Sequence, residues 1–410
     1  MAMSRFIAKH ATAALGAAIL LCALALGLAA CSHKEPAGGP IDVKYCFGEV
    51  GLSPGQFSYP RCLDHDRFSL WTIDKQARVQ RLDPRTGKYL GGWQMPEWVN
   101  GKPTGVTVWD PEGEDGPLVF IPDTHYNRVM VYDGGSYMKE GVVPGCKEGT
   151  LLTRFGSYGK GPGQFIFTTD IAVLPTPDGK AIARLYVSEY EEDDRISVYE
   201  PKTPLTKRDL LALAQSDPSP ADSSNKALPA IAHCPFEFKF SIGHYGSGAS
   251  PSDIQFNRPQ SMALDLKRQE LIVTDACNHR VGRFTLDGKL IAWISGPDKV
   301  GSLPGQFSYP YGLALLEDGS ALISEFGGNR VQHIDLQTGA SLGIYGTAGR
   351  GPGQVASPWG VTIMGKTAYV LDSGNNRVIG FDAPGAAASS TYAAHPTSDI
   401  PHPTSTGGHG

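Results

Sequence analysis

One pattern recurs along most of this 410-residue chain. Gly-Pro-Gly-Gln-Phe or a close variant stands at residues 53–57, 161–165, 303–307 and 351–355. An apolar strand of each copy starts at a Pro, or at a Thr in the third copy: Pro60, Pro103, Thr168, Pro259, Pro310 and Pro358. Repeats of this kind are copies of one supersecondary unit that buries its apolar face against its neighbours. Any fold assigned to the chain must therefore be built from six such units.

Each copy continues with a β-rich run that ends in an acid: Asp74, Asp123, Glu189, Asp275, Glu325 and Asp372. An Arg followed by Val or Ile comes next: Arg78, Arg128, Arg195, Arg280, Arg330 and Arg377. The Arg residues are spaced by 50, 67, 85, 50 and 47 residues, so the third and fourth copies carry extra residues. Six equivalent acids rarely share one catalytic task, so we expect these pairs to bridge strands or neighbouring units.

Four short β runs make up the fifth copy: residues 311–316, 321–324, 330–335 and 341–345. Repeated four-stranded sheets at this period predict an all-β fold, a six-bladed β-propeller. The 50 Gly and 31 Pro disfavour long helices, and the 41% apolar content can build a core. The sixth copy has only three runs: 359–364, 367–371 and 377–381. We expect residues 43–48 to supply the missing outer strand and close the last blade, which removes an open sheet edge.

These residues resemble the NHL repeat family. The resemblance rests on the Pro-Tyr-Gly-Leu-Ala strand at 310–314, on the turn from Glu325 through Asn329 to Arg330, and on the Gly-Pro-Gly-Gln-Phe segments. It covers residues 41–383 and implies the same six-bladed propeller. Because propellers host many functions, the resemblance alone does not name an activity.

The first thirty residues are typical of a lipoprotein signal peptide. Arg5 and Lys9 precede an uncharged apolar run over 11–30, and Cys31 follows small residues. We expect cleavage after residue 30, lipidation of Cys31 and a flexible tether over 31–40. Ser32 resembles the outer-membrane sorting signal, so we expect a lipid-anchored protein of the outer membrane that faces the periplasm or the cell surface. An uncleaved membrane anchor is the alternative, since about twenty apolar residues can span a bilayer.

Two further segments interrupt or follow the repeats. Residues 201–234 read as a surface insertion with a short helix around 210–214, and residues 384–410 read as a disordered tail. In an oxidising compartment some cysteines should pair. Cys146 and Cys234 precede successive outer strands at similar offsets, so they are the candidate disulfide.

Candidate ligand-binding residues lie where the innermost strands of a propeller begin. One cation, two large aromatic side chains and several hydrogen-bonding groups could converge there on a small polar ligand. The residues concerned are Arg61, Thr104, Thr169, Asp170, Gln260, Tyr311 and Trp359. A water-filled channel mouth without a ligand is the alternative.

The sequence favours no metal or other cofactor. The chain is similar to the peptidyl-amidoglycolate lyase core. This resemblance implies a zinc ion held by three channel histidines. However, Gln260 stands where that family has one of them, and His125 and His279 are too few for the site. Calcium stays open at the acidic run 191–194, because carboxylates suit a hard cation. A solvated acidic loop is the alternative.

The expected function is therefore binding. We expect the channel mouth to recognise an envelope protein, a peptide or a glycan, with the lipid anchor holding the chain to a membrane. A net charge of −5 disfavours nucleic acid. One alternative is a channel-site enzyme, lyase-like or lactonase-like, that uses Arg61, Asp170, Gln260, Tyr311 and Trp359. Another is a scaffold that binds through the insertion at 201–234.

Overall fold

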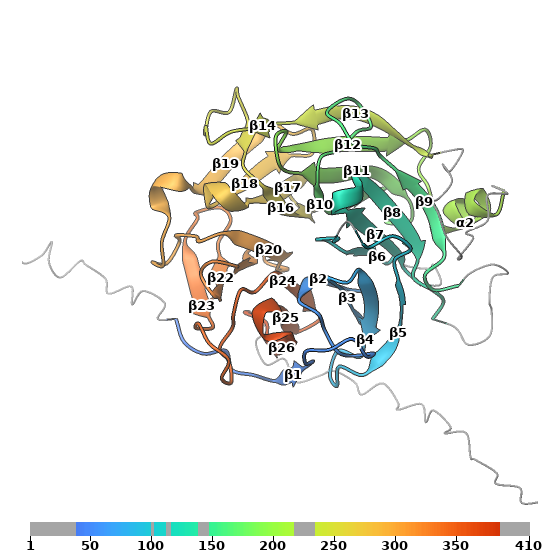
Figure 1. Ribbon diagram of the computed structural model, residues 1–410. Coiled ribbons are helices and arrows are strands. Elements are labelled where there is room, and N and C mark those ends of the chain that lie inside the picture. The colour runs from blue at the N-terminus through green and yellow to red at the C-terminus, as the bar shows by residue number, and fades with distance from the viewer. Residues whose placement is uncertain (1–37, 100–101, 112–115, 138–146, 217–233, 386–410) are drawn as a thin grey trace, which may run out of the picture.

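Six four-stranded antiparallel sheets form a ring around a central channel (Figure 1). The structure is a computed structural model that describes residues 38–99, 102–111, 116–137, 147–216 and 234–385. The predicted signal peptide, Cys31, Cys146 and nearly all of the tail lie outside these residues. The prediction of a six-bladed all-β propeller is confirmed.

Blades 1 to 5 take their strands in chain order from the channel outward, and blade 6 does so for its three inner strands. Blade 1 comprises β2 (Pro60–His65), β3 (Leu70–Asp74), β4 (Arg78–Leu82) and β5 (Tyr89–Gln94). Blade 2 comprises β6 (Thr107–Trp109), β7 (Leu118–Asp123), β8 (Arg128–Asp133) and β9 (Leu151–Phe155). Blade 3 comprises β10 (Thr168–Pro175), β11 (Ile182–Glu189), β12 (Arg195–Pro201) and β13 (Phe236–Ile242).

The second half of the ring repeats this order. Blade 4 comprises β16 (Pro259–Asp265), β17 (Glu270–Asp275), β18 (Arg280–Thr285) and β19 (Leu290–Ser295). Blade 5 comprises β20 (Pro310–Leu315), β21 (Ala321–Glu325), β22 (Arg330–Ile334) and β23 (Ser341–Tyr345). Blade 6 comprises β24 (Gly360–Met364), β25 (Thr367–Asp372) and β26 (Arg377–Asp382), with β1 (Tyr45–Phe47) as its outer strand.

The N-terminal strand closes the ring as the sequence predicts. Strand β1 pairs antiparallel with β26, so Cys46 lies opposite Ile379 (Figure 1). Upstream of β1, the Ile41 side chain is 4% exposed and packs into the core between blades 5 and 6. The Ile41 N–H also donates to the Gly353 carbonyl at 2.8 Å. Residues from opposite ends of the chain therefore complete one sheet and one core.

The apolar core is divided into six clusters, one at each junction between neighbouring blades. The junction between blades 6 and 1, for example, buries Leu63 and Leu70 against Leu371 and Val378. Packing of each blade against two neighbours explains why both faces of the middle strands are apolar. The channel and the loops at the two ends of the channel are not part of this core.

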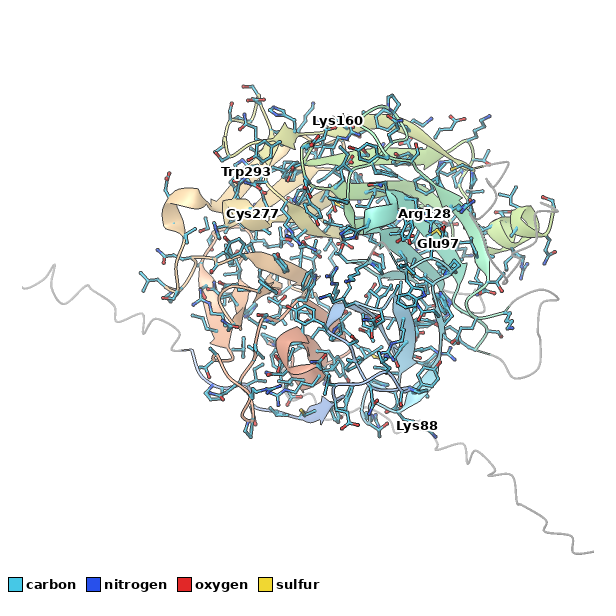
Figure 2. The ribbon with its side chains drawn as sticks, in the orientation of Figure 1. Lys88, Glu97, Arg128, Lys160, Cys277 and Trp293 are labelled. Carbon is cyan, nitrogen blue, oxygen red and sulfur yellow. The ribbon has the colours of Figure 1, made fainter. Side chains whose placement is uncertain are left out.

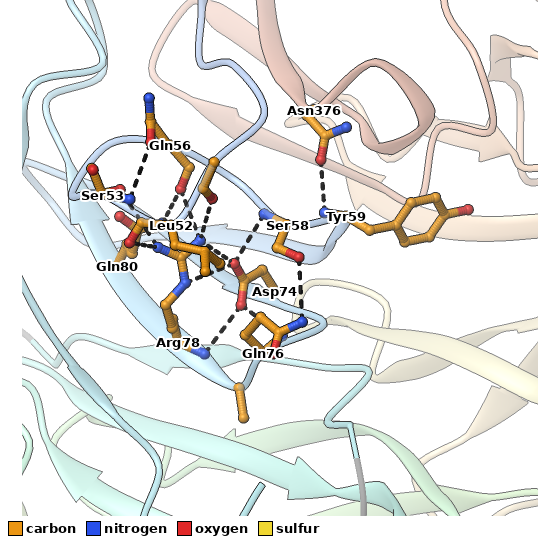
Figure 3. A network of polar contacts seen from close by, with 12 residues as sticks. Leu52, Ser53, Gln56, Ser58, Tyr59, Asp74, Gln76, Arg78, Gln80 and Asn376 are labelled. Carbon is orange, nitrogen blue, oxygen red and sulfur yellow. Dashed lines mark hydrogen bonds and ion pairs between the residues drawn. The ribbon is translucent and has the colours of Figure 1, made fainter. Parts of the chain in front are cut away.

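The repeated acids and arginines fix the loops that lead into the innermost strands. All six pairs form ion pairs with N···O distances of 2.5–2.8 Å. In blade 1, Arg78 donates to the carbonyls of Leu52 and Gln56, and Asp74 accepts the Ser58 N–H (Figure 3). In blade 2, Arg128 also pairs with Glu97 at 2.6 Å (Figure 2). The expected structural role of these residues is confirmed.

A second repeated contact joins neighbouring blades on the same side of the ring. The side chain of a residue in the turn after the second strand accepts an N–H from the loop of the next blade. Asn376 accepts from Tyr59 across the closure, at 2.7 Å (Figure 3). Equivalent contacts join Asn127 to Phe167, His279 to Tyr309, and Asn329 to Ser357. In the Asn-Arg dipeptide of the repeat, the Asn therefore joins neighbouring blades, whereas the Arg pairs with the acid of its own blade.

The insertion contains a helix, α2 (Lys207–Ser216), which lies beside β9 (Figure 1). Its Leu210 and Leu211 side chains are buried in the core between blades 2 and 3. The buried Lys207 ammonium pairs with Asp133 at 3.0 Å. The described part of the insertion therefore uses its apolar side within the molecule. No helix among the described residues is long and apolar enough to cross a membrane.

Candidate functional site

A β-bulge begins the innermost strand in four of the six blades. The pairing with the second strand skips one residue after the first strand position. The skipped residues are Arg61, Thr169, Gln260 and Tyr311. A bulge re-aims the side chain of the unpaired residue, and bulges are over-represented beside functional sites. Four of the seven candidate residues from the sequence thus share a special backbone position, which the sequence did not reveal.

The channel gathers six of the seven candidates around one cavity of about 220 Å³. They are Thr104, Thr169, Asp170, Gln260, Tyr311 and Trp359. Arg61 joins them indirectly, because its guanidinium carbon lies 5.2 Å from the centre of the Trp359 ring. The structure therefore places the candidates together.

A closed circle of contacts surrounds the channel on the side where the innermost strands begin. We call its members the mouth ring: Arg61, His125, Phe167, Tyr190, Arg258, Tyr311 and Trp359. Ring contacts of 4.6–5.6 Å run from His125 through Phe167, Tyr190, Arg258 and Tyr311 to Trp359. Lys102 closes the circle, since its carbonyl accepts from Arg61 at 3.4 Å and its N–H donates to His125 at 3.2 Å. All six blades contribute to this circle.

Two members of the mouth ring carry positive charge that no described carboxylate neutralises. Neither Arg61 nor Arg258 has a carboxylate oxygen within 4.0 Å of its guanidinium nitrogens among the described residues. Arg258 donates instead to the Gln260 amide oxygen at 2.9 Å, and its guanidinium carbon lies 4.6 Å from the Tyr190 ring centre. Burial, together with repulsion from Arg258, lowers the pKa of Arg61. The mouth therefore holds two guanidinium groups without an ion-pair partner among the described residues.

Sequence reasoning missed Arg258. It has a φ of 64° and directly precedes the strand-starting Pro259, as Tyr59, Phe167 and Tyr309 precede their own strands with φ of 49–53°. Positive φ is uncommon for residues other than Gly. The repeated position before the strand-starting residue was the available signal, because three of the six copies place an aromatic residue there.

Three of the candidates are hydrogen-bonded within the fold. The Thr169 hydroxyl donates to the Pro259 carbonyl at 2.6 Å, and the Thr104 hydroxyl contacts the Thr124 hydroxyl at 2.9 Å. Asp170 accepts the N–H of Met262 at 2.7 Å and the hydroxyl of Ser261 at 3.1 Å. The contacts of Thr169 and Asp170 join blades 3 and 4, and the Thr104 hydroxyl also lies 3.3 Å from the Thr168 and Thr169 carbonyls, which joins blades 2 and 3. They identify Thr104, Thr169 and Asp170 as residues that hold the channel together.

Burial raises the pKa of Asp170 to about 7. Its backbone and hydroxyl donors oppose that rise, but no ion pair with a cation is present among the described residues. Asp64 occupies a similar place between blades 1 and 2, where it accepts the Val108 N–H at 2.7 Å. Both carboxylates therefore lie in the channel wall as links between strands.

The remaining candidates also find partners. In the acidic run, Asp193 pairs with Arg195 at 2.9 Å, and Glu192 pairs with Lys160 at 3.2 Å. Asp194 accepts the backbone N–H of Arg258. No disulfide joins any two of the described cysteines, which are Cys46, Cys62, Cys234 and Cys277. Because Cys146 lies outside the described residues, its pairing with Cys234 stays a prediction. Calcium binding by the acidic run 191–194 likewise stays an open alternative.

Comparison with known protein families agrees with the repeat pattern found in the sequence. The NHL repeat family model matches residues 256–284, which contain β16, β17 and most of β18. No curated protein matches the chain.

Several solved structures are similar at low identity. A structural genomics protein of unknown function from Bacteroides thetaiotaomicron is 13% identical, with 85% of this chain and 74% of that chain covered and a TM-score of 0.49. A streptogramin B lyase is 14% identical, with coverages of 82% and 96% and a TM-score of 0.45. A virginiamycin B lyase from Staphylococcus aureus with quinupristin is 13% identical, with coverages of 82% and 87% and a TM-score of 0.42. These similarities assign no activity to the chain.

Proposed function

We propose that this propeller is an envelope-anchored binding module whose mouth face recognises a protein ligand. The mouth face is the side on which the innermost strands begin. Nine of the fifteen large apolar residues that are exposed in the described part of the chain lie in the loops leading to those strands. They are Val50, Leu52, Trp98, Val99, Tyr158, Tyr245, Val300, Leu303 and Tyr309. This excess of exposed apolar side chains on one side of the ring carries the proposal, because large exposed apolar surfaces mark interaction sites.

The chemistry of this face favours a protein over a glycan. The outer loops present aliphatic side chains such as Val99 and Leu303, which bury well against another protein surface. The mouth ring adds Trp, Tyr and Arg, the residue types that dominate binding energy at protein interfaces. A binding role is also favoured over a channel-site enzyme, since Asp64 and Asp170 are already engaged as links between strands. It is favoured over a scaffold role for α2, whose Leu210 and Leu211 are buried.

Anchoring to the envelope rests on the sequence of residues 1–32, with Cys31 as the lipidated residue. Several acyl chains on one Cys hold a protein stably to a bilayer. Metabolic labelling with a palmitate analogue is expected to label the wild-type protein and to leave the Cys31→Ser variant unlabelled. Equal labelling of both proteins would contradict lipidation at this position.

The binding face can be tested by capture from an envelope extract with two matched variants. Trp359→Ala removes the ring that contacts Arg61 and Tyr311 in the mouth. Leu266→Ala removes an exposed apolar residue from the β16–β17 turn on the opposite side, where it is 48% exposed. We expect one partner to be recovered with the wild type and with Leu266→Ala, and at least tenfold less of it with Trp359→Ala. Equal recovery with both variants would refute the mouth face as the binding surface.

A further inference from the structure

The paired arginines of the mouth ring are not explained by apolar recognition alone. Arg61 and Arg258 come from blades 1 and 4, and the Tyr311–Trp359 aromatic pair, with ring centres 5.0 Å apart, lies between their contacts. The repeated arginines of the fold each face a carboxylate. These two face aromatic rings instead. Two positive charges that repel one another are thus held at the mouth without an ion-pair partner among the described residues.

Most of their hydrogen-bond donors have no acceptor within the described part of the chain. A guanidinium carries five N–H groups. Arg61 uses one in a 3.4 Å contact with the Lys102 carbonyl, while its Nε is buried without an acceptor. Arg258 uses Nε on Gln260. The neighbouring Trp359, which is 8% exposed, also has a buried ring N–H without an acceptor. Several N–H donors at the mouth therefore have no hydrogen-bond acceptor among the described residues.

We propose that Arg61 and Arg258 together bind a carboxylate of the protein ligand. This assignment rests on the proposed function and names the chemical group that the mouth recognises. Arginine pairs with a planar carboxylate through two parallel N–H···O bonds, and partial burial strengthens such a pair. The aromatic contacts restrict the two long side chains in advance, which lowers the entropy lost on binding.

Nearby acids do not take this role in the structure. Asp194 accepts the backbone N–H of Arg258, and Asp64 and Asp170 accept backbone N–H groups inside the channel. Glu191 and Glu192 line a neighbouring pocket with Tyr190 and Arg258, yet neither forms an ion pair with Arg258. Neither guanidinium therefore has an ion-pair partner among the described residues that a carboxylate from a ligand would have to displace.

The carboxylate can come from an acidic side chain or from a C-terminus, and three peptides distinguish these sources. The first, acetyl-Gly-Glu-Tyr-Glu-Gly-amide, has only side-chain carboxylates. The second, acetyl-Gly-Gln-Tyr-Gln-Gly, has only the terminal carboxylate. The third is the neutral amide of the second. Isothermal titration measures their binding to the full-length protein and to Arg61→Gln, Arg258→Gln and Arg85→Gln variants. Arg85 is an exposed cation in the β4–β5 turn on the opposite side.

We expect at least one carboxylate peptide to bind the wild type and Arg85→Gln equally, and to bind at least tenfold more weakly to Arg61→Gln and to Arg258→Gln. The better peptide identifies the source of the carboxylate. Unchanged melting temperatures of the variants confirm that they fold. The assignment is overturned if no carboxylate peptide binds better than the neutral one, if both mouth variants bind as the wild type does, or if inorganic phosphate binds more tightly than the peptides.

The same variants separate this assignment from the proposed function. If the captured partner requires Trp359 but binds both Gln variants normally, the carboxylate assignment fails and the mouth face remains the binding surface. If the partner binds without Trp359 as well, the proposed function itself fails.

Discussion

Replacing Arg280 by Met is expected to lower the free energy of unfolding by about 3–5 kcal/mol, the range found when one member of a buried ion pair is removed. Arg280 is 1% exposed and pairs with the fully buried Asp275 at 2.8 Å. It also donates to the carbonyls of Gly248 and Gln255 at 2.9 and 2.7 Å. The substitution leaves a buried carboxylate without its cation and two loop carbonyls without a donor. Guanidinium unfolding monitored by tryptophan fluorescence measures the loss.

The pH dependence of this loss gives a second readout. Burial raises the pKa of Asp275, and Arg280 opposes that rise. Without Arg280 the pKa in the folded state is higher still, so the folded protein binds the proton more tightly than the unfolded chain. The loss of stability should therefore be larger at pH 8 than at pH 5. Arg85→Met, an exposed substitution, should change stability by less than about 0.5 kcal/mol. A loss below about 1 kcal/mol for Arg280→Met would contradict a structural role for the repeated pairs.

A chain that begins at Glu49, and so lacks β1 and Ile41, is expected to be less stable by about 5 kcal/mol. Removing a buried Ile side chain costs about 2–5 kcal/mol, and each backbone hydrogen bond to β26 contributes about 1 kcal/mol. The truncation also exposes β26 as an open sheet edge, which promotes association between chains. Denaturant unfolding and size-exclusion chromatography measure the two effects.

A chain that begins at Gly38 is the matched control, because it retains every described contact of the closure. An Ile41→Ala variant of that chain should lose about 2–4 kcal/mol and stay monomeric, since β1 still covers β26. Equal stability and equal monomer content of the chains beginning at Gly38 and at Glu49 would show that the N-terminal strand does not close the ring.

The architecture follows from the repeat because each copy carries its own strand, turn and ion-pair signals. The Asp-Arg spacing predicts ion pairs, since a residue that ends one strand and a residue that begins the next lie together across a tight turn. The closing strand at 43–48 could be predicted because the sixth copy lacks a fourth strand. These conclusions depend on local sequence patterns and on the number of strands in each copy. Neither requires knowledge of side-chain geometry.

The site could be predicted only in part. The starts of the innermost strands locate the channel mouth, so Tyr311, Trp359 and Gln260 are found from the sequence. The bulge at Arg61 and at Tyr311 depends on how two strands pair, which the sequence does not specify. The engagement of Thr104, Thr169 and Asp170 depends on which groups of the neighbouring blade they meet. Arg258 was missed because its place in the mouth follows from a positive φ at one residue.

The central claim is that ligand binding occurs on the mouth face, and hydrogen–deuterium exchange with the captured partner tests it most directly. We expect the partner to slow exchange in the loops 156–167, 188–194 and 256–260, which surround the mouth ring. Exchange in the opposite turns, at 83–88 and 265–269, should stay unchanged. Protection confined to those turns or to the outer strands, with exchange in the mouth loops unaltered, would contradict the claim.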